Sequence, residues 1–407
     1  MWELIQSNKR KSLILFFGMG ALLLLIGFIF GSYYDSESGG IVGVFFAIIV
    51  WLILSAASYF GGSKILLAVS GAKEVTKDIH PQLYNVVEEM KIAAGVPYLP
   101  KIYIIDDPAP NAFATGVKPE NSAIAVTSGL LSTLNRYELQ GVVAHEMSHI
   151  INRDILLMTF AGMMLGAITL MSEVFFRGLY FGGGSRYRSR SSSKNSSGQA
   201  QVIVMILAMV LAILGPILAQ LFYFAISRKR EYLADASAAR LTRYPEGLAS
   251  ALEKIANSTH TLRTANKVTA PMYIVNPLKK EGMKLADLTS THPPISERIK
   301  ILRALQQGIS YKDYQKIYEI ISGKKEKIIP DSALKEAVPL MPLQNAFTEE
   351  KDFNPVEAKR QTGDILMKMN QYQFINCSCG VRIKVPPDYN RSVVVCPRCG
   401  RKHSINR

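Results

Sequence analysis

Cysteine is missing from most of this chain. All four cysteines lie in the last 31 of its 407 residues, and the first 376 residues contain none. A small secreted fold held together by disulfides carries its cysteines throughout. Their absence therefore excludes a disulfide scaffold, and it indicates a reducing compartment with one local metal site near the C-terminus.

Charged residues are also scarce. They make up 19% of the chain against 48% hydrophobic residues, and the mean hydropathy is +0.14. This composition is too apolar for an ordinary soluble protein of this length and indicates several membrane spans. The net charge of +15 is dispersed rather than gathered in one block. It favours contact with an anionic lipid bilayer, and no nucleic-acid partner is expected.

Four apolar segments have the length of a membrane span: 13–30, 41–60, 155–176 and 202–226. Pro216 predicts a kink in the fourth. The basic residues 9–11 precede the first segment, and Asp35 and Glu37 follow it, so the N-terminus is expected in the cytoplasm. We therefore predict a multi-pass protein of the cytoplasmic (inner) membrane, with residues 61–154 on the cytoplasmic side.

The third and fourth segments leave two possibilities open. The loop between them, 177–200, carries five basic residues and no acid. Placing this loop outside goes against the positive-inside rule, which the basic residues 228–230 offset only in part. Either the two segments cross the membrane completely, or they form a hairpin that enters without crossing.

The chain divides into six parts by composition and periodicity. Within residues 71–154, strands are predicted at 101–105 and 123–127 and a helix at 135–152. The parts are two transmembrane helices at 1–70, an α/β region at 71–154, a hydrophobic helical hairpin at 155–226, a helical region at 227–310, a connector without strong periodicity at 311–370 and a separate small unit at 371–407.

The stretch GVVAHEMSHIINRD, residues 141–154, carries a candidate metal site. On a helix, His145 and His149 fall on one face one turn apart, so both imidazoles can reach one ion. Glu146 then projects beside that ion, where it can take a proton from water activated by zinc. The alternative is a helix that carries two surface histidines.

A catalytic zinc needs a third protein ligand and one open position. The candidate lies in SRKREYLADASAARL, where Glu231 and Asp235 stand four residues apart on a predicted helix. Glu231 would ligate the metal, and Asp235 could accept a hydrogen bond from a liganding imidazole. Acidic residues at this spacing also commonly just face solvent.

Five motifs occur together in one order: PNAFATG (110–116), VTSGLL (126–131), ELQGVVAHEMSHIINRD (138–154), SRKREYLADASAA (227–239) and STHPPISERI (290–299). This order resembles the HtpX-type membrane zinc metallopeptidases, a family that also includes the CAAX prenyl endopeptidases. The resemblance covers about residues 1–305, and the tail lies outside it. It implies an α+β integral membrane protein with a mainly helical, gluzincin-type metallopeptidase domain and a small sheet.

The resemblance also implies roles for residues at matching positions. The catalytic zinc would be held by His145, His149 and Glu231. Glu146 would act as general base, and Asp235 would accept a hydrogen bond from a liganding imidazole. His292 and Arg298 resemble the pair that approaches the substrate carbonyl, where a donor would stabilise the oxyanion. For His292, the alternative is a residue at the start of a helix.

A further role concerns the NAFA stretch. Asn111, Ala112 and Phe113 resemble the edge strand along which an extended substrate pairs. For Asn111 and Phe113, a turn and a core position are the alternatives.

The four cysteines form a second candidate site. They follow the pattern C-x-C, sixteen residues, C-x-x-C, which predicts a zinc ribbon with one structural zinc held by the four thiolates. The ligands would be Cys377, Cys379, Cys396 and Cys399. A disulfide pair is the alternative.

Residues 377–407 hold seven Lys and Arg against one Asp. This basic surface would suit nucleic acid, acidic lipid, an acidic protein or simply solvent, and the lack of an aromatic platform argues against single-stranded nucleic acid.

Together these features predict a zinc metalloendopeptidase of the membrane that acts on proteins or peptides. The resemblance suggests quality control of misfolded membrane proteins. Two alternatives remain. One is a CAAX-type prenyl protease, whose relatives carry more membrane spans. The other is an adaptor without catalysis, in which the ribbon recruits a partner; such proteins commonly lack the base or a ligand, and all are present here.

Overall fold

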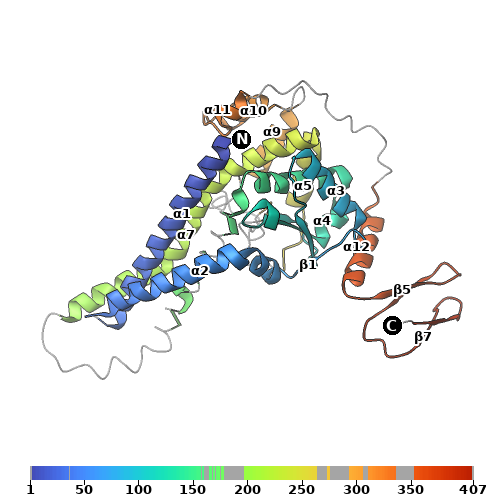
Figure 1. Ribbon diagram of the computed structural model, residues 1–407, viewed down its shortest axis with the longest axis horizontal. Coiled ribbons are helices and arrows are strands. Elements are labelled where there is room, and N and C mark those ends of the chain that lie inside the picture. Colours follow the sequence, from blue (N-terminus) through green and yellow to red (C-terminus); the bar gives the residue numbers. More distant parts are fainter. Residues whose placement is uncertain are drawn as a thin grey trace.

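The protein is mainly helical with small sheets, and a long helical arm projects from the domain that holds the largest sheet (Figure 1). The computed structural model describes residues 2–35, 37–156, 197–263, 273–275, 293–305, 310–335 and 353–405, together with 158, 159, 165, 166, 168, 169, 171–174, 176 and 177. Much of the expected third apolar segment and most of the loop that follows it lie outside these residues.

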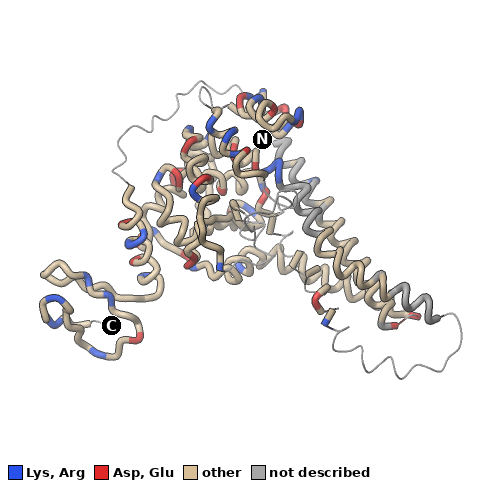
Figure 2. Tube along the Cα trace, turned by 180° about the vertical axis from the view of Figure 1, so that it is seen from behind, with Lys and Arg blue, Asp and Glu red and all other residues tan. Residues whose placement is uncertain are grey.

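Two helices of the arm are candidate membrane spans. Helix α1 covers Trp2–Tyr34 and α2 covers Gly39–Val69, and within the described residues these are the two helices long and apolar enough to cross a bilayer. Few charged residues lie along the described part of the arm, whereas the domain carries charged residues of both signs (Figure 2). The first two predicted spans therefore agree with the structure by length and composition.

Glycines let α1 and α2 approach closely. A Cβ added to Gly43 would lie 2.0 Å from the carbonyl oxygen of Gly27, and one added to Gly31 would lie 1.9 Å from that of Gly39. These glycines are spaced four apart on each helix, the small-residue pattern by which membrane helices pack backbone to backbone. Any side chain at these positions would push the two helices apart.

The expected fourth span lies within one helix of 46 residues, α7 (Ser197–Thr242). The helix continues through Pro216, so the proline does not end it. Membrane helices tolerate proline where neighbouring groups satisfy the freed carbonyl, and α7 runs beside α1 along the arm (Figure 1). The same helix carries Glu231 and Asp235 into the domain.

The domain is built on a four-stranded sheet of order β1-β2-β4-β3. Strand β2 (Lys101–Ile105) is parallel to β4 (Ala123–Thr127) and antiparallel to β1 (Ala72–Glu74). Strand β3 (Ala112–Thr115) is antiparallel to β4 and ends the strand order, so it presents an edge. The strands predicted at 101–105 and 123–127 are confirmed.

Side chains of the strands alternate between two cores, as the two-residue period of a strand requires. In β3, Ala112 and Ala114 face the larger core, and Phe113 faces the smaller one. The larger core also holds the helix predicted at 135–152, which the structure has as α5 (Arg136–Ile151). The smaller core receives the C-terminal end of α2, through Leu66 and Leu67.

The remaining helices complete the larger core. They are α3 (Pro81–Ala93), α4 (Ser128–Thr133), α8 (Pro245–Ala256), α9 (Ile295–Ala304), α10 (Tyr311–Ser322) and α11 (Asp331–Leu334). A 3-10 turn at Pro119–Asn121 lies outside this core. Helix α10 lies in the stretch expected to be a connector. Its Tyr311, Tyr314 and Tyr318 follow a helical spacing and are buried in the core, so this part belongs to the domain.

The C-terminal unit is joined to the domain by α12 (Pro355–Met369), which packs against α4. Two small antiparallel sheets follow, β5 (Gln373–Asn376) with β6 (Arg382–Val385) and β7 (Val393–Val395) with β8 (Lys402–Ser404). Asp364 of α12 pairs with Arg382 at 3.2 Å and with Lys384 at 2.6 Å. These ion pairs tie the first small sheet to α12.

Candidate metal centre and active site

Helix α5 sets the position of the two histidines. It begins with a capping box, in which the side chain of Asn135 accepts from the backbone of Glu138 and the Glu138 carboxylate accepts from the backbone of Asn135. His145 and His149 follow roughly three and four turns later on one face, and both are buried. The fixed start of the helix therefore sets where both imidazoles lie.

Three side chains from two helices converge on one point. The Nε2 atoms of His145 and His149 lie 3.3 Å apart. The carboxylate of Glu231 on α7 lies 3.5 Å from Nε2 of His145 and 3.6 Å from Nε2 of His149. Ligands about 2.0–2.1 Å from a tetrahedral zinc are separated by roughly 3.3 Å. The spacing of the three ligand atoms therefore fits a zinc ion.

The outer nitrogen of each imidazole faces a buried carboxylate. Nδ1 of His145 lies 3.0 Å from Asp235, and Nδ1 of His149 lies 3.2 Å from Asp154. A carboxylate at Nδ1 holds the proton there and leaves Nε2 as a lone pair. The Nε2 atoms of both rings and the carboxylate of Glu231 are then all available to one cation.

The electrostatics of His145 point the same way. Burial lowers the pKa of His145, but the hydrogen bonds to Asp235 and then to Glu231 outweigh it and raise this pKa to about 9. The surroundings of this ring therefore stabilise positive charge, which a divalent metal supplies when it binds.

Asp154 was not predicted from the sequence. Its second carboxylate oxygen lies 3.4 Å from Nη1 of Arg230, the residue directly before Glu231. Arg153 takes a left-handed conformation with φ of 60°, and this turn follows the end of α5 and brings Asp154 back toward His149. An acid five residues after the second histidine was the available signal, but the left-handed turn that makes it useful could not be predicted.

Arg298 of α9 completes the buried network. Its side chain is fully buried and lies with Nη1 3.6 Å from Glu231, while two other guanidinium nitrogens contact Asp235. Asp235 thus joins Arg298 to His145. The pKa of the Asp235 carboxyl stays below its ordinary value, since the charge of Arg298 and its hydrogen bonds outweigh the effect of burial. The other predicted member of this pair, His292, lies outside the described residues.

Glu146 lies next to the ligands on α5 and is almost fully buried. Burial raises the pKa of its carboxyl, and a backbone hydrogen bond from Ala114 of β3 opposes this effect. A carboxylate with a raised pKa is a better proton acceptor than an exposed one. The contact also fixes Glu146 against the edge strand.

The predicted substrate residues lie at the start of that strand. Asn111, Ala112 and Phe113 are all buried, and the backbone N–H of Asn111 donates to Oγ1 of Thr127 at 2.9 Å. Ala112 lies on the face of the sheet turned toward α5, and Phe113 lies on the opposite face. The backbone of β3 is therefore held firmly beside the ligand cluster.

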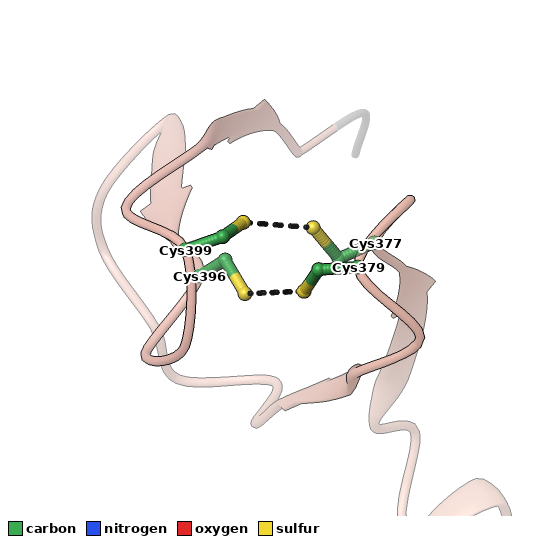
Figure 3. A group of neighbouring side chains, drawn as sticks. All are labelled: Cys377, Cys379, Cys396 and Cys399. Atoms are coloured by element: carbon green, nitrogen blue, oxygen red, sulfur yellow. Dashed lines mark hydrogen bonds between the residues drawn. The ribbon is translucent and has the colours of Figure 1, made fainter.

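The four cysteines of the C-terminal unit also converge (Figure 3). Sγ of Cys377 lies 3.5 Å from Sγ of Cys399, and Sγ of Cys379 lies 3.6 Å from Sγ of Cys396. Thiolates about 2.3 Å from a tetrahedral zinc are separated by roughly 3.8 Å, whereas bonded sulfurs are about 2.0 Å apart. The four are free cysteines with the spacing of a metal site.

Left-handed glycines close the two turns that present these thiols. Gly380 and Gly400 have φ of 84° and 72°, and their N–H groups donate to the carbonyls of Cys377 and Cys396. Backbone hydrogen bonds from Cys399 and, less strongly, Arg398 lower the pKa of Cys396 to about 6, against the effect of burial. At Cys396 the turn thus favours the thiolate, which is the form that binds metal, whereas the neighbouring thiols raise the pKa of Cys399 to about 11.

Comparison with known proteins agrees with this geometry. Residues 78–306 match the family described as Peptidase family M48. A Protease HtpX homolog of Dictyoglomus turgidum is 47% identical over 304 residues, which is 75% of this chain and 94% of that protein. A Protease HtpX homolog of Caldanaerobacter subterraneus subsp. tengcongensis is 44% identical over 306 residues, 75% of this chain and 98% of that protein.

Among solved structures, Ste24p of S. mikatae is 21% identical, with 74% of this chain and 67% of that chain covered at a TM-score of 0.39. The family match ends at residue 306, so α12 and the cysteine cluster lie beyond it. The match to the family and the identities to the HtpX homologues cover the ligand cluster and the edge strand, and on these grounds the chain belongs to peptidase family M48, among its HtpX-type membrane metallopeptidases.

Proposed function

We propose that the protein is a membrane-bound zinc endopeptidase that cleaves peptide bonds with water. One observation carries this proposal: the ligand atoms of His145, His149 and Glu231 all lie within 4.8 Å of one another, and Glu146 lies beside them. Zinc bound there would act as a Lewis acid and lower the pKa of water toward about 7. Three protein ligands leave the fourth position open for the reaction.

The residues around the ligands divide the remaining work. Glu146 takes a proton from the attacking water and delivers it to the leaving amine, which is the role of a general base that becomes a general acid. Asp235 and Asp154 hold the two imidazoles in the tautomer that binds metal. Arg298 directs Nη1 toward the space beside Glu231, where it can donate to a carbonyl oxygen. His292 is proposed to assist Arg298 at the substrate carbonyl.

Substrate binds along β3 in this proposal. An extended peptide adds to a sheet edge through main-chain hydrogen bonds, which read the backbone more than the side chains. A polypeptide must be locally unfolded to present such a segment. This requirement fits misfolded or damaged membrane proteins, and it supports a role in protein quality control.

We place the enzyme in the cytoplasmic membrane with its active site facing the cytoplasm. The basic residues before α1 and the two apolar helices support this orientation. The apolar part of α7 and the segment before it would form the third and fourth membrane segments.

The cysteine cluster is proposed to hold a second zinc. Four thiolates leave no open position, so this ion would have a structural role. Helix α12 then connects the ribbon to the peptidase domain.

The experiment that tests this function compares two substrates with protein purified in detergent. One is an unfolded protein carrying a fluorescent label, and the other is a peptide with a prenylated C-terminal tetrapeptide. The proposal predicts cleavage of the unfolded protein that disappears when zinc is chelated and returns when zinc is added. Cleavage of the prenylated peptide and not of the unfolded protein would contradict the proposal and favour a prenyl protease.

A further inference from the structure

The edge of β3 that faces away from β4 is already occupied by the chain itself. Residues 273–275, here called the edge segment, lie between α8 and α9 in the sequence. The N–H of Ile274 donates to the carbonyl oxygen of Ala112 at 2.9 Å. This is a main-chain hydrogen bond of the kind that an added strand makes.

The side chain of Asn111 holds the next residue of the segment. Its Nδ2 donates to the carbonyl oxygen of Val275 at 2.8 Å, and its Oδ1 accepts from the N–H of Val275 at 3.3 Å. The side-chain amide of Asn111 thus bonds both the N–H and the carbonyl group of Val275. Because these bonds use only main-chain groups, they do not depend on which side chain stands at position 275.

Arg298 contacts the same segment from the side of the metal ligands. Its Nη1 donates to the carbonyl oxygen of Ile274 at 3.3 Å and lies 3.6 Å from Glu231. The carbonyl of Ile274 therefore lies beside the ligand cluster and receives the hydrogen bond that the proposed mechanism reserves for a substrate carbonyl.

The side chains of the segment alternate as in a strand. Ile274 is buried in the core shared with α5, while Tyr273 is buried in the core on the other face of the sheet. The ring of Tyr273 meets Phe113 edge to face, with centroids 5.1 Å apart. Both faces of the edge therefore accept bulky apolar side chains.

We propose that the edge segment is an internal ligand of the substrate edge, which must leave before an extended peptide rich in bulky apolar residues can bind. This inference rests on the proposed function of β3. The segment copies the main-chain contacts of a substrate, and its side chains indicate the substrate class. An internal occupant lowers the fraction of enzyme that is competent to bind, and it raises the apparent KM by the reciprocal of that fraction.

The test weakens the segment and leaves the residues of β3, Asn111 and Arg298 unchanged. Ile274→Pro removes the N–H that bonds to Ala112, and Ile274→Val keeps it as a matched control. Tyr273→Ala removes the aromatic contact to Phe113 instead. Loss of one such contact shifts an equilibrium by about two- to tenfold. We expect the KM for a peptide with aromatic and aliphatic residues to fall by this factor in Ile274→Pro and Tyr273→Ala, with kcat unchanged.

A binding measurement separates this inference from the proposed function. Each variant is also made with Glu146→Gln, and the Kd of the same fluorescent peptide is measured by anisotropy with zinc bound. Tighter binding in Ile274→Pro than in Ile274→Val supports the internal ligand even if no cleavage is found. Equal Kd values in folded variants with full zinc content overturn it, as does a loss of kcat with KM unchanged.

A synthetic peptide of residues 270–278 gives an independent check. It should inhibit the Ile274→Pro variant competitively, and a scrambled peptide of the same composition should not. Equal inhibition by both peptides contradicts the proposal. Cleavage of the wild-type chain between Tyr273 and Ile274, seen by mass spectrometry, would make the segment a substrate and would also contradict an inhibitory role.

Discussion

Arg298 and Asp235 form a fully buried ion pair, in which Nε and Nη2 of the arginine donate to the two carboxylate oxygens at 2.8 and 2.7 Å. The same carboxylate lies 3.0 Å from Nδ1 of His145. One pair therefore links α9, α7 and α5 behind the metal ligands. Through it, a residue that contacts the edge segment also fixes the orientation of a ligand.

Removing Arg298 should cost stability. In Arg298→Met, Asp235 stays buried and charged without its partner, which costs about 3–5 kcal/mol of unfolding free energy. The matched control is Arg303→Met on the same helix, since Arg303 pairs with Glu246 and Glu253 at the surface. Exposed pairs contribute about 0–1 kcal/mol. Chemical unfolding of both variants checks this, and equal losses would contradict the role given to the buried pair.

Asp154 should control zinc affinity. Asp154→Asn keeps the shape of the side chain but removes the charge beside His149, and loss of such a partner commonly weakens a metal site by about 10–100-fold. Zinc affinity, measured by competition with a chelator, is the readout. The exposed Asp78→Asn serves as control. A variant that binds zinc as tightly as the wild type would show that Asp154 does not position the ligand.

His80 should make stability depend on pH. It caps α3, with Nδ1 accepting from the N–H of Leu83, and burial lowers its pKa to about 4. In the unfolded chain His80 binds a proton near pH 6.5, so above that pH its neutral form contributes fully to the free energy of unfolding. As the pH falls from 6.5 toward 4, the free energy of unfolding decreases by up to about 3 kcal/mol, because only the unfolded chain takes up this proton.

The variant His80→Asn isolates this effect, because asparagine can accept the same capping bond and does not titrate. The free energy of unfolding of zinc-loaded protein is compared between pH 7 and pH 5. We expect a smaller acid loss in His80→Asn than in the wild type. Identical losses would assign the acid sensitivity to other groups.

Cys396→Ser should remove one zinc and leave the other. The cysteine cluster lies on a separate unit joined through α12, so we expect elemental analysis to give two zinc ions per chain in the wild type and one in the variant, with kcat unchanged. Ser392→Ala, in the same unit, is the control. Two zinc ions in both proteins would exclude the cluster as a zinc site.

Local periodicity predicted the strands at 101–105 and 123–127 and the helix that carries His145, because these elements repeat every two or every 3.6 residues. It missed α10, whose fully buried residues are three tyrosines and Gln315 rather than aliphatic residues. The convergence of His145, His149 and Glu231 could be predicted because the two histidines are neighbours on one helix and Glu231 lies in a family motif.

Contacts that depend on tertiary structure could not be predicted. The link from Asp154 to His149 depends on the left-handed conformation of Arg153. The pairing of Ile274 with Ala112 joins segments more than 160 residues apart, which no local pattern encodes. Both contacts follow from how the chain folds around the sheet.

The most direct test of the account is Glu146→Gln. This substitution keeps the three ligands and removes the proton acceptor, and the loss of a general base lowers kcat by about 10²–10⁴-fold. Both proteins are purified in parallel, their zinc contents are matched, and cleavage of an unfolded substrate is followed. The account predicts cleavage by the wild type and almost none by Glu146→Gln at equal zinc content. Equal rates in the two proteins would contradict catalysis by Glu146 at this site.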